Sequence, residues 1–282
     1  MAKVAIVTDS TVNLPKNVIN EYSITVVPQI VIWDNKTYLD GIDIQPGEFY
    51  TRLKSSQSMP SSSQVTPITM RDTFSGLLDQ GFEVLAITVS SHLSGTMNSA
   101  IQAKDMLPGK PVELVDSLTA SMALGFQVLM AARAAKNGAT LNECKAITEK
   151  ARKQSGVYFV VDTLEFLHRG GRIGGAARLL GTALNLKPIL TVTDGKIEPV
   201  ARVRTQRKAF EKMLNILEEK LDHGSISRLS VLHANAASQA DQLMSELVQR
   251  FHPTETIMTE VSPVIGTHTG PGTVGVAYLI DM

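Results

Sequence analysis

The sequence predicts an α/β protein with two domains: a first domain with a mostly parallel sheet flanked by helices, and a second α+β domain with a mixed sheet. In the first half, the apolar segments are short, rich in Val and Ile and not alternating, which is typical of strands buried on both faces of a sheet. Helical patterns lie between these segments, and such alternation favours parallel strands. In the second half, Asp194-Gly195 joins two apolar segments, which is typical of a tight hairpin.

In chain order, strands are expected in the first half at residues 4–7, 26–32, 84–89 and 112–115, and helices at 68–80, 96–106 and 119–137. The last helix is rich in Ala and Leu and is closed by Gly138, a residue type common after helix C-termini. In the second half, strands are expected at 158–161, 188–193, 197–204, 229–233, 256–261 and 275–280, and helices at 176–184, 207–221 and 238–251. Because hairpins and helices are mixed there, we place the domain boundary near residue 157, which gives domains 1–157 and 158–282.

The composition indicates a globular protein, since 43% of the 282 residues are hydrophobic and 19% are charged. Lys plus Arg and Asp plus Glu number 27 each, so bulk charge gives no reason to expect nucleic acid as a partner. The single cysteine, Cys144, allows neither an intrachain disulfide nor a cysteine metal site. The chain starts without a long apolar signal stretch, and its most apolar segment, 122–135, is too short to span a bilayer, so a soluble cytoplasmic protein is expected.

Three polar segments, each expected to be a loop beside an apolar strand, are candidates for chemistry: residues 61–67, 90–96 and 266–272. The second segment is the strongest candidate for a ligand site, because ligands of parallel sheets lie beyond the carboxyl ends of the strands. There Ser94-Gly95-Thr96 begins a helix, and free N–H groups at a helix start attract a carboxylate or phosphate. The structural alternatives stay open: Ser94 or Thr96 is simply a helix cap, the serines are a surface loop, and His268 is an ordinary histidine.

Several common functional motifs are absent or misleading. Residues 270–275 have the spacing G-x-G-x-x-G, but only seven residues follow Gly275, so no dinucleotide-binding unit can be completed. The chain has no G-x-x-x-x-G-K-[ST] loop for ATP, no G-x-S-x-G elbow and no H-E-x-x-H zinc motif. No metal site and no tightly bound cofactor are therefore expected.

Together, these segments resemble motifs of the DegV family, and within it the fatty-acid-binding subunits of bacterial fatty-acid kinase. The matching segments are 4–10, Pro28, Asp40-Gly41, Ser62-Ser63-Gln64 (family T-S-Q), 90–96 (family S-S-x-L-S-G-T), Gly170-Gly171-Arg172-Ile173 (family G-G-R-I) and 266–272 (family G-T-H-x-G-P-G). The resemblance runs nearly end to end. Two positions depart from it: Ser62 replaces a Thr but keeps the hydroxyl, and Val65 replaces a Pro.

The resemblance implies a DegV-like fold with one long-chain fatty acid, such as palmitate, stearate or oleate, in a pocket at the domain interface. It implies that Ser62, Ser94 and His268 contact the carboxylate, and that Ser63, Gly95, Thr96 and Thr269 surround it. Arg172 and Arg204 match arginines of the phosphoryl or kinase-docking side. A separate DAK-type fatty-acid kinase subunit would bring ATP and Mg²⁺, so this chain would be a lipid-binding subunit and not itself an enzyme. Transient contact with a membrane is compatible with this role.

Simple free-energy estimates support different roles for the acyl tail and for the polar residues. Burying about 16 carbons at ~0.8 kcal/mol per CH₂ yields a gross gain on the order of 10 kcal/mol. A dry, unpaired carboxylate costs several kcal/mol, which hydrogen bonds from two hydroxyls and a histidine roughly offset. The tail therefore supplies affinity, and the polar residues position the carboxylate.

Two other functions are weighed against this one. A serine esterase or thioesterase would use Ser94 as nucleophile and His268 as base, with Asp9 as the orienting acid. A carrier of phosphorylated ligands would use the turn at residues 170–175 with Arg172. Preference for acyl length and unsaturation, oligomeric state, lid motion and the kinase-docking surface have no signature in the sequence.

Overall fold

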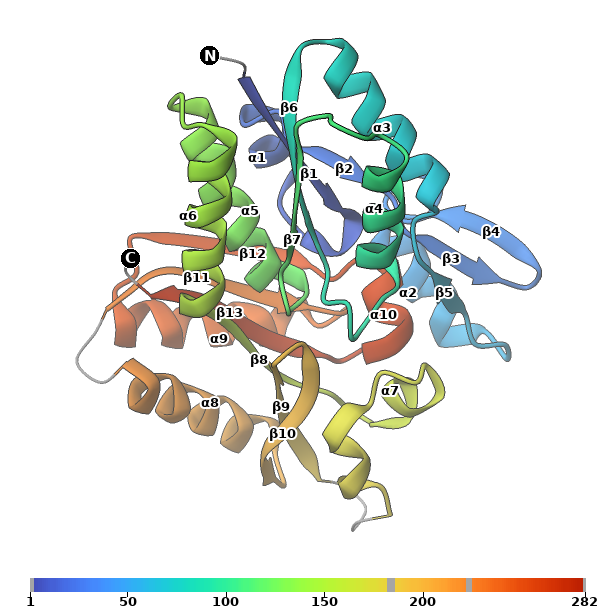
Figure 1. The fold of residues 1–282 in the computed structure, drawn as a ribbon. Helices are drawn as coiled ribbons and strands as arrows, with labels where there is room; N and C mark the ends of the chain where they lie inside the picture. The colour runs from blue at the N-terminus through green and yellow to red at the C-terminus, as the bar shows by residue number, and fades with distance from the viewer. Residues whose placement is uncertain (1–2, 182–185, 222–224, 281–282) are drawn as a thin grey trace.

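The computed structural model describes residues 3–181, 186–221 and 225–280 (Figure 1). The first half contains β1 (Lys3–Asp9), the 3-10 helix η1 (Ser10–Val12), α1 (Lys16–Glu21), β2 (Thr25–Val27), β3 (Ile30–Trp33), β4 (Lys36–Leu39), α2 (Pro46–Ser55), β5 (Ser61–Ser63), α3 (Pro67–Asp79), β6 (Phe82–Thr88), α4 (Thr96–Asp105), β7 (Val112–Asp116), α5 (Ser121–Lys136) and α6 (Leu141–Gln154). The second half contains β8 (Ser155–Val160), α7 (Glu165–Arg169), the 3-10 helix η2 (Gly174–Leu179), β9 (Lys187–Thr193), β10 (Lys196–Val203), α8 (Gln206–Leu221), β11 (Ile226–His233), α9 (Ala237–Phe251), β12 (Glu255–Glu260), α10 (Pro263–Thr269) and β13 (Val274–Ile280).

The first half is built on a parallel sheet of order β2-β1-β6-β7, as predicted. Helices α3 and α4 cover one face, where Phe74 packs against Val84, and α5 and α6 cover the other, where Leu85 is buried (Figure 1). Because both faces are covered, the two central strands contain runs of successive apolar residues, Val4–Val7 in β1 and Val84–Ile87 in β6. This explains why the strand segments do not alternate in the sequence.

The second half is built on a mixed sheet of order β10-β9-β8-β13-β11-β12, in which only β11 and β12 pair in parallel. The predicted hairpin at Asp194-Gly195 is confirmed, and both residues have positive φ, 49° and 80°. Helices α8 and α9 cover one face of this sheet, and the other face packs toward α5. The predicted α/β fold with a parallel and a mixed sheet is therefore confirmed, while the division at residue 157, which lies within β8, stays a prediction.

Three sequence expectations are corrected in the first half and near the chain end. Residues 26–32 are not one strand: the chain breaks at Pro28-Gln29, and β3 joins a separate antiparallel sheet of order β4-β3-β5. The serines at 61–63 form strand β5 of that sheet rather than a loop, because they pair with β3. Gly266–Thr269 lies in helix α10 rather than in a loop, since Pro263 begins the helix and the Asp40 carboxylate accepts from Val264 N at 3.1 Å.

A fourth correction concerns the predicted helix at residues 176–184. The structure has the 3-10 helix η2 over Gly174–Leu179, and Leu180 is extended, with ψ 139°. Glycine-rich chain favours such a short, tight turn over a longer helix. Residues 182–184 of the predicted helix lie outside the described residues. Cys144 is a free, buried thiol on α6.

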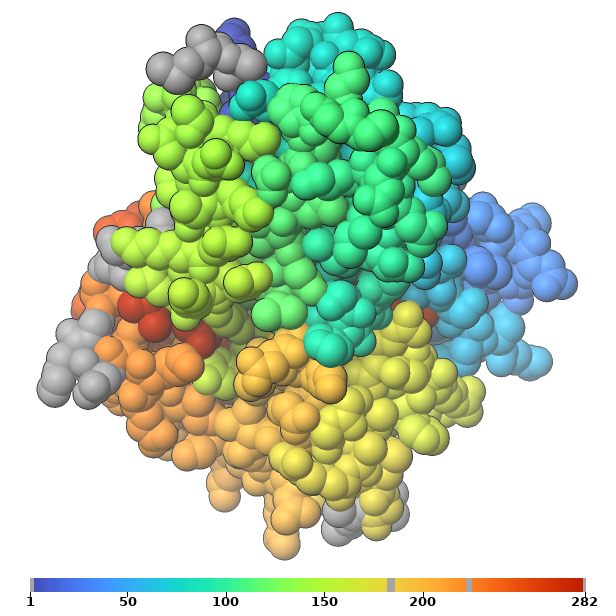
Figure 2. All heavy atoms as spheres, in the orientation of Figure 1, coloured from blue at the N-terminus to red at the C-terminus, as the bar shows by residue number. Residues whose placement is uncertain are grey.

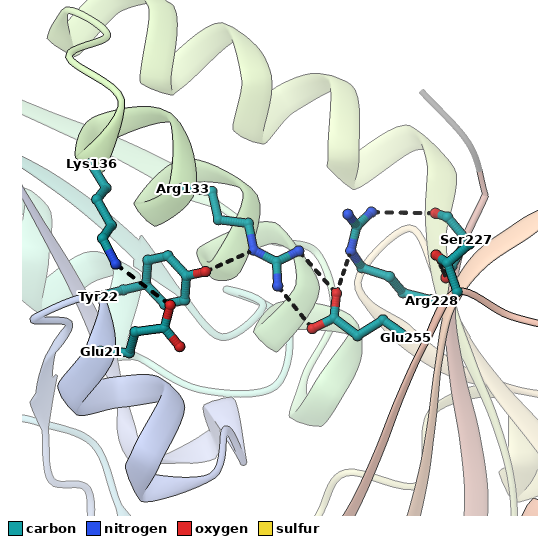
Figure 3. A network of polar contacts seen from close by, with 8 residues as sticks. Glu21, Tyr22, Arg133, Lys136, Ser227, Arg228 and Glu255 are labelled. Atoms are coloured by element: carbon teal, nitrogen blue, oxygen red, sulfur yellow. Dashed lines mark hydrogen bonds and ion pairs between the residues drawn. The ribbon is translucent and has the colours of Figure 1, made fainter.

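A polar network ties the helices of the first half to the sheet of the second (Figure 3). Arg133 of α5 donates to both carboxylate oxygens of Glu255 on β12, at 2.9 and 2.8 Å, and to the Tyr22 hydroxyl at 3.3 Å. Arg228 of β11 donates to the same carboxylate at 2.9 Å. One carboxylate thus pairs with two guanidinium groups that are only 28% and 21% exposed.

Replacing Glu255 by Gln is expected to lower the free energy of unfolding by about 2 kcal/mol, because two half-buried cations lose their counter-charge. Urea unfolding at pH 7 measures this. The matched control is Glu21→Gln: its ion pair with Lys136 is 3.5 Å long and more than half exposed on both sides, so its loss should change stability by less than about 0.5 kcal/mol. Equal effects of the two substitutions would show that the network is only a surface feature.

No helix within the described ranges is long and apolar enough to cross a membrane.

Candidate functional site

A largely apolar cavity lies where the two halves meet, lined by strands of the mixed sheet, by β5 and by the segments that follow the parallel strands. It contains about 840 Å³ of empty space, counted together with the open solvent at its mouth. Its apolar wall includes Val89 after β6, Val157 and Phe159 of β8, Leu232 of β11, and Val264 and Ile265 of α10. An apolar ligand would therefore lie between the mixed sheet and the loops at the carboxyl ends of the parallel strands.

Polar side chains gather on one part of this wall. Of the residues predicted to contact a carboxylate or surround it, five line the cavity: Ser62, Ser63, Ser94, His268 and Thr269. Ser62 and His268 are 206 residues apart in sequence, yet Ser62 Oγ and His268 Nε2 are 2.7 Å apart. Tertiary packing therefore brings together the residues that the sequence singled out.

Two secondary elements position the Ser62–His268 pair. Ser62 lies opposite Val31 in the β3–β5 pairing, and His268 lies on α10, which packs against both strands. Gly170 closes the other side of the ring: a Cβ on this residue would lie 2.1 Å from His268 Nδ1. The ring therefore turns Nδ1, a buried atom with no hydrogen-bond partner among the described residues, toward Gly170 and turns Nε2 toward Ser62.

Burial, and to a smaller extent the nearby positive charge of Arg172, lower the pKa of His268 to about 4. The imidazole is therefore neutral near pH 7. A neutral ring can orient the Ser62 hydroxyl without forming a tight ion pair with an acidic ligand. This is the property expected of a group that positions a carboxylate rather than neutralising it.

The pH dependence of stability provides a test of this state. The folded pKa of His268, about 4, is below the ordinary value of 6.5, so its contribution is fully present above pH 6.5 and is lost as pH falls toward 4. Wild type should lose up to about 3 kcal/mol relative to His268→Gln between pH 7 and 4. Urea unfolding of ligand-free protein at several pH values measures the difference. Parallel curves would contradict the assignment.

The comparison with the variant is needed because Asp40 acts in the opposite direction. Burial raises the pKa of Asp40 to about 6, although hydrogen bonds from Ser10 and Val264 oppose this shift. Stability from Asp40 is therefore fully present below pH 3.8 and is lost as pH rises through about 6. The difference between wild type and His268→Gln cancels this shared term.

Ser94 is tied to its neighbours rather than to His268. Its Oγ lies 2.9 Å from Thr96 Oγ1 and 3.4 Å from Gln29 Oε1, and it accepts from Thr96 N at 3.3 Å. The helix cap is Gly95, so neither Ser94 nor Thr96 is the N-cap residue of α4. Gly95 and Thr96 do not line the cavity themselves, but a Cβ at Gly95 would lie 2.6 Å from Gln64 Nε2, so the missing side chain lets Gln64 approach.

Sequence reasoning missed Gln29, which lines the cavity and is only 3% exposed. Its Nε2 donates to Asp9 Oδ1 at 3.2 Å, and Asp9 Oδ2 accepts from Val89 N at 2.8 Å. Asp9 also accepts from Thr11 Oγ1 at 2.7 Å. The signal was present in the sequence: a glutamine after Pro28, inside an apolar run, interrupts the expected strand and needs a buried partner.

The two predicted arginines lie in different places. Arg172 lines the cavity, and its guanidinium donates to Leu93 O at 2.9 Å and to Gly170 O at 2.7 Å. Arg204 is exposed and lines a separate surface hollow beside Arg202 and Lys187. Arg172 therefore lies in the cavity wall, whereas Arg204 lies outside the cavity.

The geometry does not assemble the catalytic triad of the esterase hypothesis. His268 bonds to Ser62 and not to Ser94, and Asp9 is used by Thr11, Gln29 and Val89. For the phospho-ligand hypothesis, backbone carbonyls already accept two N–H groups of Arg172. Across the described part of the chain, no group of three His, Cys, Asp or Glu side chains is arranged to hold a metal ion.

The fold and site define a class: an α/β protein with a parallel, a mixed and a small antiparallel sheet, and with an apolar cavity that carries hydroxyls and a neutral imidazole on one side. A family model described as "Uncharacterised protein, DegV family" matches residues 3–281. The chain belongs to the DegV family.

Individual relatives agree with this assignment. The chain is 36% identical over 279 residues to a DegV domain-containing protein of Listeria innocua, covering 99% of each protein. It is similar to a Thermus thermophilus structure described as fatty acid binding of a DegV family protein, with a TM-score of 0.94, 35% identity and coverage of 99% and 100% of the two chains. It is also similar to Bacillus subtilis DegV, described as a fatty acid binding protein, with a TM-score of 0.90, 30% identity and full coverage of both chains.

Proposed function

We propose that this chain binds one long-chain fatty acid in the cavity and presents its carboxylate to a separate kinase. The observation that carries the proposal is the cavity itself: about 840 Å³, with apolar walls and the Ser62–His268 pair at its polar side. The Thermus and Bacillus relatives, which are described as fatty-acid-binding proteins, support the choice of ligand.

In this proposal the polar residues orient the acid. The hydroxyls of Ser62 and Ser94 donate to the carboxylate, and His268 holds the Ser62 hydroxyl through Nε2. Ser94 donates to Gln29 Oε1 at 3.4 Å, a long hydrogen bond that a carboxylate acceptor can replace. Ser63 and Thr269 complete the polar lining. One carboxylate oxygen is left for reaction.

The partner would be a kinase subunit of the DAK type that brings ATP and Mg²⁺ and converts the acid to an acyl phosphate. In that reaction a carboxylate oxygen attacks the γ-phosphorus, the bond between the γ-phosphorus and its bridging oxygen breaks, and ADP leaves. This chain contributes the orientation of the nucleophilic oxygen and the exclusion of water. Its own residues hold no nucleotide in this scheme.

The direct test is to extract purified protein with organic solvent, identify any acyl chain by mass spectrometry, and titrate delipidated protein with oleate. The proposal expects one acyl chain per protein or saturable binding of added oleate. If the purified protein holds no acyl chain and does not bind added oleate, the fatty-acid function is contradicted. An esterase would instead turn over a chromogenic acyl ester in a manner abolished by Ser94→Ala.

Substitution of Arg204 by Ala should leave oleate affinity within about twofold of wild type, because the side chain lies outside the cavity. Phosphorylation of bound oleate by the partner kinase should fall, since an exposed arginine is suited to docking or to stabilising phosphoryl charge. Arg172→Ala tests the other position, where loss of oleate would show that the arginine acts inside the cavity. Oleate loss in the Arg204 variant would contradict its placement.

A further inference from the structure

A second hollow, named here the polar cleft, opens between the C-terminal end of α6, the β9–β10 hairpin and α8. It contains about 1,080 Å³ of empty space, counted with its open mouth. In Figure 2 it faces the viewer, between the yellow-green of α6 and the gold and orange of the hairpin and α8. Nothing in the proposed fatty-acid function uses this cleft.

The polar cleft is separate from the apolar cavity in which the fatty acid is proposed to bind, named here the acyl cavity, although the two hollows share a wall. Along β8, Val157 and Phe159 line the cavity, whereas Gly156 and Tyr158 line the cleft. This is the alternation of a strand whose successive residues point to opposite faces. After β7, Ala120 faces the cavity and Thr119 the cleft, so the two hollows have different chemistry.

The charge of the cleft favours an anion. Among the described residues, its lining includes Arg152, Lys153 and Lys220, against one carboxylate, that of Asp194. Arg152 is held in place because its Nη1 donates to the Asp116 carbonyl at 2.9 Å. An anchored guanidinium beside two exposed ammonium groups suits a doubly charged group such as a phosphate monoester better than a single carboxylate.

Two buried polar atoms on the wall lack partners. Thr119 is 6% exposed and Gln127 is 1% exposed, yet Thr119 Oγ1 and Gln127 Oε1 have no hydrogen-bond partner in the part of the chain that the structure describes. Gln127 Nε2 donates to Ser117 O and to Ser155 Oγ, both at 3.2 Å, so its amide orientation is fixed. Its free oxygen is an acceptor and needs a donor, which a ligand hydroxyl supplies.

Two tyrosines add a flat, hydroxyl-bearing side to the cleft. The rings of Tyr158 and Tyr278 stack with centroids 5.9 Å apart and planes 15° apart. Gly156 permits this arrangement, because a Cβ there would lie within 2.4 Å of the Tyr278 hydroxyl oxygen. The cleft thus combines cations with hydroxyl and amide groups around one space.

We propose that the polar cleft binds a hydroxylated phosphate monoester of about the size of a pentose phosphate. The phosphate lies against Arg152, Lys153 and Lys220, and ligand hydroxyls bond to Thr119 and Gln127. The site is independent of the acyl cavity and of the proposed fatty-acid function.

The first test is calorimetric titration of the purified full chain at low salt with ribose 5-phosphate, inorganic phosphate and ribose. The proposal expects saturable binding of ribose 5-phosphate at one site, binding of phosphate at least about tenfold weaker, and no binding of ribose. Failure of ribose 5-phosphate to saturate would overturn the proposal. Equal affinity for phosphate and ribose 5-phosphate would also overturn it, because the ligand hydroxyls would then contribute nothing.

The second test uses variants chosen to preserve folding. Thr119→Val removes an unpartnered hydroxyl at constant shape, so the unfolding temperature should be unchanged or slightly higher, while affinity for ribose 5-phosphate falls about fivefold. Lys153→Gln with Lys220→Gln should weaken binding about tenfold and flatten its salt dependence. The matched control, Lys150→Gln with Lys208→Gln, changes two exposed lysines outside the cleft and should stay within about twofold.

Unchanged affinity in either Thr119→Val or the Lys153 and Lys220 double variant would overturn the assignment. Oleate titration of the same samples separates this site from the acyl cavity, since both variants should bind oleate like wild type. Loss of oleate in parallel with ribose 5-phosphate would show that the variants act on the acyl cavity, and the cleft would not be a separate site.

Discussion

Replacing Leu232 by Trp is expected to remove most fatty-acid binding while the protein stays folded. Leu232 lies on β11, is 4% exposed and lines the acyl cavity. An indole there occupies space that the acyl tail needs. Excluding about five methylenes at ~0.8 kcal/mol each removes about 4 kcal/mol, or roughly a thousandfold in affinity. Titration of delipidated protein with oleate, together with mass spectrometry of co-purified lipid, measures the loss.

The matched control is Leu232→Met, which keeps the volume of the side chain and should bind oleate within a few-fold of wild type. The unfolding temperature of the ligand-free Trp variant should be equal to or above that of wild type, because the indole fills an existing space. Wild-type oleate affinity in a folded Trp variant would show that the tail does not lie in this cavity.

Replacing Ser62 by Ala is expected to separate binding from phosphorylation. The hydroxyl is 2.7 Å from His268 Nε2, and its loss removes one donor to the carboxylate. Oleate affinity should fall about tenfold, the value for one hydrogen bond to a charged group. The rate of acyl-phosphate formation at saturating oleate should fall about a hundredfold, because a carboxylate displaced by about 1 Å reacts poorly.

Ser61→Ala is the control, since Ser61 is the exposed neighbour on β5 and does not line the cavity. In that variant, both the oleate affinity and the rate of acyl-phosphate formation should match wild type. The assay combines oleate-loaded protein, the partner kinase and Mg-ATP, and follows ADP release. A Ser62 variant that loses affinity and rate by the same factor would contradict the claim that this hydroxyl orients the acid more than it tightens binding.

The sequence alone was sufficient for the two sheets because strand burial is encoded locally. Residues 84–87 are apolar at every step, and this matches β6, which is covered on both faces. The Asp194-Gly195 hairpin was equally readable, since positive φ at both positions restricts the residue types. In these segments the local pattern and the tertiary environment agree.

The segments that were predicted wrongly are those whose structure depends on distant partners. Ser61–Ser63 reads as a polar loop, but it becomes a strand because β3 offers free pairing groups. The segment 266–272 reads as a glycine-rich turn, but four of its residues extend α10, whose first turn is held by Asp40, more than 200 residues earlier in the chain. No local propensity records such a contact.

The sequence by itself determined the residue types of the site: hydroxyls at 62 and 94, an imidazole at 268, and enough apolar chain to enclose a ligand. Only the tertiary structure decided that His268 bonds to Ser62 and not to Ser94, and that Gln29 lines the cavity. It also decided that Arg172 lies in the cavity wall while Arg204 lies in a separate surface hollow. The reason is that side-chain chemistry is a property of single residues. Hydrogen-bond partners, burial and the pKa of His268 instead arise from segments that meet only when the two sheets pack together.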